Sequence, residues 1–177
     1  LDAYPKWEVV LTQMNYLDEY YQTGVMGLDE LKRLNIGSMI MEPLRGGRLV
    51  QNIPPEVQKL WDCAEVKRTP VEWALEYLWN RDDVDCVLSG MNSLEQVKQN
   101  IQIASNVKEI SESDQDLIRE VARTYKTLTG NECTSCGYCM PCPEGVDIIN
   151  CFNEYNIGKM LNNPKGSAMQ YFSLIDE

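Results

Sequence analysis

The sequence predicts a parallel α/β fold followed by a small cysteine-rich segment, and three observations lead to this prediction. Short apolar runs typical of strands buried in a parallel sheet occur along the first half of the chain. A polar loop and an amphipathic segment of helical period follow these runs. Near the other end, four cysteines fall within ten residues. Repeated strand–loop–helix units form right-handed parallel β/α structure, with ligand sites in the loops at the carboxyl ends of the strands.

The first strand–helix–strand unit occupies residues 9–47. Residues 9–11 predict a strand that is covered on both faces of the sheet. Residues 27–34 carry leucines at helical spacing and predict a short amphipathic helix. Residues 38–41 predict the second strand, and residues 42–47, with a proline and two glycines, predict the loop that ends it.

Two further helix starts and a third strand continue the alternation of strands and helices along the chain. A pair of prolines opens a helix predicted over residues 54–63. Thr69 is followed by proline at the first helical position and by Glu72 at the third, which predicts a capping box. Residues 84–88 predict the third strand, and Ser93 is a suitable N-cap for a helix over the following residues, 94–104.

The pattern changes after residue 106. Residues 111–128 predict one long amphipathic helix, and a short helix is expected to begin at residue 148, with part of the remaining tail helical. The first residue is not methionine and the last residues follow an apolar stretch, so we expect a longer parent protein. Three parts are predicted: an α/β part over residues 1–107, a helix and connector over 108–130, and a truncated cysteine-containing domain over 131–177.

The cysteine run is Cys133-Thr-Ser-Cys136-Gly-Tyr-Cys139-Met-Pro-Cys142, closed by a proline. A lone zinc ion binds sulfur at about 2.3 Å and usually takes ligand pairs from separate places in the chain. Three successive two-residue gaps would crowd the backbone around one ion, whereas an iron–sulfur cube offers one iron to each cysteine. The spacing therefore favours a [4Fe-4S] cluster over zinc and over an unmetallated thiol cluster, both of which stay open.

The fourth ligand is less well defined than the first three. The bacterial ferredoxin pattern has three residues before its fourth cysteine, which serves the other cluster in two-cluster proteins. Here two residues precede Cys142. Either Cys142 completes this cluster, or it serves a second one and the missing thiolate comes from Cys151 or from outside the chain.

Composition excludes several functions. The net charge of −11 argues against nucleic acid and anionic membrane surfaces as partners, and no apolar run is long enough for a membrane span. The chain has no histidine, which excludes Ser/His/Asp and Cys/His nucleophilic schemes and histidine-ligated metals. The cysteine spacing suits a reduced cytoplasmic metal site better than disulfides. Cys63 and Cys86 lie in apolar patterns and are expected to be packed free thiols.

Five stretches are distinctive together: residues 13–16, 41–47 and 69–75, residues 88–96 with Asn100, and the cysteine run with residues 143–148. They resemble the carboxyl-terminal half of the aldo/keto reductases, in the branch with an appended ferredoxin-like domain. The resemblance covers nearly the whole chain. It implies the last three β/α units of a (β/α)₈ TIM-type barrel, followed by a small, mostly helical ferredoxin-like iron–sulfur domain.

The resemblance also implies half of a nicotinamide nucleotide site. Gln13 would hydrogen-bond the nicotinamide carboxamide, and Met41 stands where the family usually stacks an aromatic ring. Pro43, Leu44 and Arg45 would line the pyrophosphate. The loop that would hold the adenosine 2′-phosphate and the helix face that would contact adenine contribute seven residues: Ser89, Gly90, Met91, Asn92, Gln96, Gln99 and Asn100.

Plainer roles remain open for some of these residues. Gln13 could satisfy backbone groups at a barrel rim, Met41 could fill the core, and Gln99 could be a solvated helix residue. Gly90 and Gln96 stand where many reductases carry lysine and arginine, so the choice between NADP(H) and NAD(H) stays open. The family's catalytic Asp, Tyr, Lys and His lie in the earlier half, and no residue of this chain is assigned a catalytic role.

Three functions compete. The first is part of a nicotinamide-dependent oxidoreductase that acts on a carbonyl or an alcohol, with a cluster that transfers electrons to a redox partner or braces the structure. The second is a non-enzymatic iron–sulfur carrier or interaction module, and the third a zinc-stabilised binding module. Three β/α units leave sheet edges and an apolar face uncovered, so the chain by itself is expected to be poorly soluble or to oligomerise.

Overall fold

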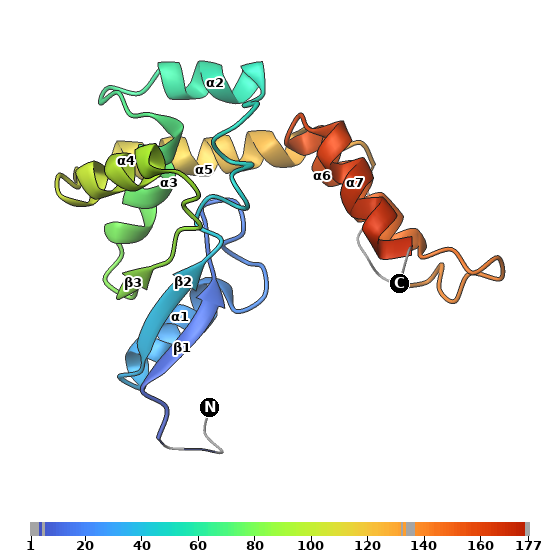
Figure 1. The fold of residues 1–177 in the computed structure, drawn as a ribbon, viewed down its shortest axis with the longest axis horizontal. Helices are drawn as coiled ribbons and strands as arrows, with labels where there is room; N and C mark the ends of the chain where they lie inside the picture. The colour runs from blue at the N-terminus through green and yellow to red at the C-terminus, as the bar shows by residue number, and fades with distance from the viewer. Residues whose placement is uncertain (1–3, 5, 132, 134–136, 176–177) are drawn as a thin grey trace. The chain divides into compact units, whose positions relative to one another are not determined.

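The computed structural model describes residues 4, 6–131, 133 and 137–175, which form three strands and seven helices (Figure 1). The chain divides into two compact units. Unit 1 comprises residues 1–51 and 64–119, and unit 2 comprises residues 52–63 and 120–177. The boundaries predicted from the sequence, at residues 107 and 130, stay predictions.

Unit 1 contains a three-stranded parallel sheet in the order β1-β2-β3. The strands are β1 (Val9–Gln13), β2 (Gly37–Met41) and β3 (Cys86–Val87). Strands that run parallel need a crossover connection, and α1 (Gly24–Arg33) supplies it between β1 and β2. The prediction of a parallel α/β fold is confirmed.

One face of this sheet is buried. Thr12, Ser38 and Ile40 are each almost fully inaccessible, and the facing helices contribute buried side chains such as Leu28 and Leu31 of α1. α1 contacts β2, and α3 (Pro70–Trp79) contacts β3. Apolar side chains from these helices and the sheet thus form the core of unit 1.

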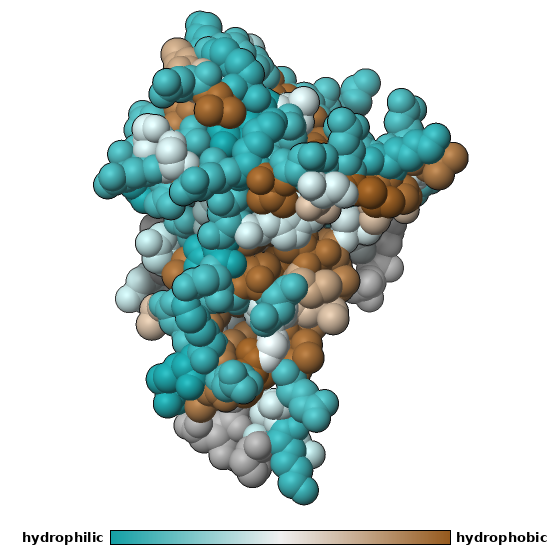
Figure 2. Space-filling model, turned by 90° about the vertical axis from the view of Figure 1, so that its left-hand side faces the viewer, coloured by the Kyte–Doolittle hydropathy of each residue, from teal (hydrophilic) through white to brown (hydrophobic). Residues whose placement is uncertain are grey.

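The other face of the sheet is uncovered within the described residues. Val9 is 51% exposed and Leu11 is 52% exposed. Figure 2 shows hydrophobic surface in its lower half, the part of the view in which Figure 1 draws β1 and β2. Cys86 is exposed too, because the register places it beside Met39, which pairs with Leu11. The expectations that residues 9–11 are covered on both faces and that Cys86 is packed are therefore wrong for this structure.

The predicted helix starts of unit 1 have the expected caps. The Thr69 hydroxyl accepts a hydrogen bond from the Glu72 amide at 3.2 Å, and the Glu72 carboxylate accepts one from the Thr69 amide at 2.6 Å. This is the predicted capping box. The Ser93 hydroxyl likewise accepts from the amide of Gln96 at 3.2 Å and starts α4 (Leu94–Ala104).

Unit 2 is helical in the part that the structure describes. α6 (Ile148–Met160) and α7 (Pro164–Ile175) pack closely at Gly158, where a Cβ would lie 3.1 Å from the Ser167 side chain. The Asn156 side chain accepts hydrogen bonds from the amides of Gly130 and Asn131, so it holds the backbone just before the cysteine run.

The remaining helices are α2 (Pro55–Asp62) and α5 (Glu112–Thr127). Cys63 follows α2 as its C-cap and is exposed, which corrects the expectation that it is packed. No helix among the described residues combines the length and apolar character that a membrane span requires.

Candidate functional site

A cavity of about 600 Å³ lies in unit 1 at the carboxyl ends of β2 and β3. Two loops form most of its wall. The first follows β2 and contributes residues between Met41 and Gln51, and the second follows β3 and continues into α4, from Leu88 to Asn100. Ligand sites of parallel α/β sheets lie at this edge, and the volume falls in the range common for small-molecule pockets.

The cavity gathers most of the residues predicted to bind a nucleotide. Ten of the twelve line it: Met41, Pro43, Leu44, Ser89, Gly90, Met91, Asn92, Gln96, Gln99 and Asn100. The exceptions are Gln13 and Arg45. Gln13 is the register partner of Met41, and Arg45 lies in the same loop as Pro43 and Leu44, so both adjoin the lining residues in the chain or the sheet.

The loop after β2 has an unusual backbone. Glu42 and Arg45 adopt positive φ angles of 58° and 51°, and the glycines that follow Arg45 have φ angles of 61° and 80°. Positive φ is costly for residues with a Cβ, and such conformations concentrate at binding sites. The Arg45 amide donates to the Glu42 carbonyl at 3.1 Å, which closes a tight turn and presents the loop at the cavity.

Side chains of α4 fix the second loop. The amide of Asn92 donates to the Gln96 side-chain oxygen at 2.9 Å, and the Asn100 side chain donates to the Ser89 hydroxyl at 3.0 Å. Gln96 and Asn100 therefore shape the loop as well as face the cavity. The loop leads into the amino end of α4, where backbone N–H groups and the helix dipole favour an anion.

The cavity lining contains no lysine or arginine among the described residues, and Glu42 is its one charged residue. A 2′-phosphate would therefore meet hydroxyl, amide and backbone donors instead of a cation.

Two polar residues that sequence reasoning missed contact the loop after β2 without lining the cavity. Asn15 is fully buried and Asp18 is 8% exposed. The Asp18 carboxylate accepts from the side chains of Gln13 and Asn15, and it pairs with Arg45. The polar residues Gln13, Asn15 and Asp18, which follow an apolar strand and alternate with apolar residues, were the available signal, but the partner in the next loop is not visible in the sequence.

The cysteine run lies in unit 2 and is described in part. Cys133 and Cys142 are half-buried and Cys139 is exposed, while Cys136 lies outside the described residues. No three His, Cys, Asp or Glu side chains within the described positions are grouped so that they could hold a metal ion. Four thiolates are chemically suitable for iron–sulfur ligation, but the described side chains do not converge on one point.

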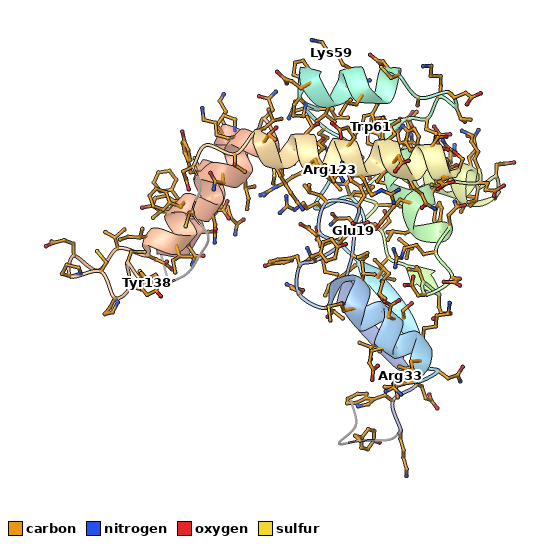
Figure 3. All side chains as sticks on the ribbon, turned by 180° about the vertical axis from the view of Figure 1, so that it is seen from behind. Glu19, Arg33, Lys59, Trp61, Arg123 and Tyr138 are labelled. Carbon is orange, nitrogen blue, oxygen red and sulfur yellow. The ribbon has the colours of Figure 1, made fainter. Side chains whose placement is uncertain are left out.

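The described backbone at Gly137 is open. Gly137 has a φ of 80°, and among the described residues no atom beyond its chain neighbours lies within 4 Å of the position of a Cβ. Tyr138 beside it is almost fully exposed (Figure 3). An open glycine backbone leaves room for a bulky inorganic group to approach its N–H.

No protein-family model matches the chain, and no curated protein matches it. Solved structures do match it, among them the holo and apo forms of the aldo-keto reductase AKR11C1 from Bacillus halodurans. Both have a TM-score of 0.52 and 21% sequence identity over 64% of this chain. The likeness is one of fold. The match covers 42% of the holo chain and 43% of the apo chain, so this chain spans less than half of those structures.

Proposed function

We propose that the chain forms the nucleotide side of a nicotinamide-dependent oxidoreductase of the aldo/keto reductase type. The observation that carries the proposal is the cavity at the carboxyl ends of β2 and β3, which gathers ten of the twelve expected nucleotide contacts. The likeness in fold to AKR11C1 agrees with it. A bound nicotinamide would exchange hydride with a carbonyl or alcohol substrate, while the residues of this chain bind and orient the nucleotide.

The nicotinamide, the pyrophosphate and the adenosine of the nucleotide would each lie against different residues. Gln13 and Met41 end two neighbouring strands and would face the nicotinamide. The turn at residues 42–47 would lie along the pyrophosphate, and the loop at residues 88–92 with the start of α4 would receive the adenosine end. We assign no catalytic residue to this chain. The proton donor for the carbonyl oxygen would come from further β/α units that complete the barrel.

The test of this proposal is equilibrium binding of NADPH and NADH to the chain, with Gly90→Lys as a gain-of-charge variant. Among the described residues, a Cβ at Gly90 meets no atom within 4 Å beyond its chain neighbours, so a side chain can start there without displacing the loop. A charge-assisted bond to a 2′-phosphate should tighten NADPH binding about tenfold and leave NADH binding unchanged. Nucleotide fluorescence titration measures both.

Gln102→Lys is the matched control, because it adds the same charge to an exposed position of α4 outside the cavity lining. It should alter neither affinity measurably. If the unmodified chain binds neither NADPH nor NADH, the proposed function is wrong. If Gly90→Lys increases the affinity for both nucleotides equally, the assignment of the loop at residues 88–92 to the adenosine end is wrong.

The uncovered sheet face predicts self-association of the chain when it is produced alone. Parallel sheets are almost always covered on both faces, and β1 and β3 have open edges within the described residues. Sedimentation velocity should show oligomers of the chain. Leu11→Lys should shift them towards monomer, whereas Met26→Lys, on an exposed position of α1, should not. A wild-type monomer would contradict this account of the face.

We also propose that Cys133, Cys136 and Cys139 ligate a [4Fe-4S] cluster in a ferredoxin-like domain, with Cys142 or Cys151 as the fourth ligand. The support is the cysteine spacing and the open backbone at Gly137. When bound, the cluster would pass single electrons to a redox partner protein or brace the loop. Reduced thiolates of this kind suit the cytoplasm.

A further inference from the structure

Three side chains, from the end of β1, the loop after it and the loop after β2, meet on one oxygen of Asp18. Its Oδ2 accepts from Nε2 of Gln13 at 3.2 Å and from Nδ2 of Asn15 at 3.0 Å. Nε of Arg45 lies 3.1 Å from the same oxygen. Asp18 is 8% exposed, so these bonds form largely out of solvent, where hydrogen bonds to a charged group are strong. This carboxylate joins the end of β1 to the loop after β2.

Asn15 holds Asp18 in place. The Asn15 side-chain oxygen accepts from the amides of Leu17 and Asp18, both at 3.0 Å. Its Nδ2 donates to Asp18 and, at 3.2 Å, to the carbonyl of Glu42, a residue with positive φ. The hydrogen-bonding capacity of this fully buried amide is thus used to fix the carboxylate and the strained turn together.

The Arg45 guanidinium is oriented by this arrangement. Its Nε faces Asp18, while Nη1 is buried and has no hydrogen-bond partner in the part of the chain that the structure describes. A buried unpaired donor is costly, and a guanidinium is well suited to phosphate oxygens. Arg45 does not line the cavity, but its chain neighbours Leu44 and Gly46 do, so the unpaired Nη1 indicates an anionic ligand bound beside this loop.

We propose that Asp18 is a positioning residue for the nucleotide. It holds the Arg45 guanidinium so that Nη1 reaches the pyrophosphate, and it holds the Gln13 carboxamide so that its oxygen stays available to the nicotinamide amide. Asp18 itself touches neither group. The inference rests on the proposed function, because it names what fixes two of the expected contacts.

A second buried ion pair provides a comparison. Asp83 is also 8% exposed and accepts two bonds from Arg81, at 2.8 and 2.6 Å. It lies before β3, away from the strand ends that form the cavity. If Asp18 served stability alone, substitutions at these two carboxylates would have the same kind of effect on nucleotide binding.

The experiment measures binding of two probes to Asp18→Asn, Asp83→Asn and the unmodified chain. NADPH spans the whole site, whereas adenosine 2′-monophosphate, which carries no phosphate of the pyrophosphate, reaches the adenosine end only. Asp18→Asn should weaken NADPH binding about tenfold, because a neutral amide no longer anchors Arg45, and should leave the monophosphate affinity unchanged. Asp83→Asn should leave both affinities unchanged. Circular dichroism checks that each variant is folded.

Coupling to Arg45 separates positioning from general loosening. In an Arg45→Ala background, Asp18→Asn should cause a smaller loss of NADPH affinity than in the unmodified chain, since only the Gln13 contact then depends on Asp18. Asp18→Glu keeps the charge but displaces Arg45, and should also weaken NADPH binding; it replaces Asp18→Asn if that variant does not fold.

Unchanged NADPH affinity in Asp18→Asn, equal weakening of both probes, or additive losses with Arg45→Ala would each overturn the positioning role while the proposed function stands. If the unmodified chain does not bind NADPH, the proposed function fails, and the positioning role fails with it.

Discussion

Replacing Arg68 with methionine is expected to lower the free energy of unfolding by about 3–5 kcal/mol. The Arg68 side chain is fully buried in unit 1 and pairs with Glu76 at 2.7 Å and with Asp114 at 3.1 Å. Those carboxylates are 1% and 6% exposed. Without the guanidinium, two negative charges would remain buried beside each other, which costs far more than an exposed pair is worth.

Urea unfolding followed by tryptophan fluorescence measures this loss, because the Arg68 guanidinium lies 4.5 Å from the centre of the Trp73 ring. Arg119→Met is the control, since Arg119 pairs with Asp116 on the exposed surface and should have no measurable effect. Adding Glu76→Gln and Asp114→Asn to Arg68→Met should recover part of the stability. Equal stability of Arg68→Met and the unmodified chain would show that the ion pairs of Arg68 contribute nothing to the free energy of unfolding.

The second large effect is expected from Cys139→Ser. If Cys139 ligates one iron of a [4Fe-4S] cluster, its loss should abolish the brown chromophore of anaerobically purified protein and remove the bound iron and labile sulfide. Residues 131–150 should become more accessible to proteases, while the thermal unfolding of unit 1 should change little. Iron and sulfide analysis measures the bound cluster, and visible absorption spectroscopy measures the loss of the chromophore.

Cys63→Ser is the matched control, because Cys63 is also exposed but lies outside the cysteine run. It should keep full iron content. Comparing Cys142→Ser with Cys151→Ser identifies the fourth ligand, since only one of them should reduce the iron content per chain. Unchanged iron content in Cys139→Ser, or zinc in place of iron, would contradict the ligand assignment.

Local signals made much of the fold predictable. Thr69 with Glu72, and Ser93 before α4, start helices where the sequence places them, since a cap depends on residues only a few positions apart. The strands follow from short apolar runs, although β3 is shorter than the predicted 84–88. Ten of the twelve residues expected to contact a nucleotide line one cavity at the carboxyl ends of the strands.

Pairings between distant segments were not predictable. Arg68 meets Asp114, and Asp18 meets Arg45, across 46 and 27 positions of the chain, and no local pattern marks either pair. The exposure of strand side chains was also predicted wrongly, because it depends on which segments cover the sheet. Leu11 and Cys86 have the sequence pattern of buried strand residues, but no described residue covers their face.

The central claim is that the carboxyl ends of β2 and β3 receive a nicotinamide nucleotide. Hydrogen–deuterium exchange of the chain with and without saturating NADPH tests it most directly. The account predicts slower exchange in residues 41–51 and 88–100, and no change in residues 148–175. Exchange that NADPH leaves unchanged in both loops, or protection confined to residues 148–175, would contradict it.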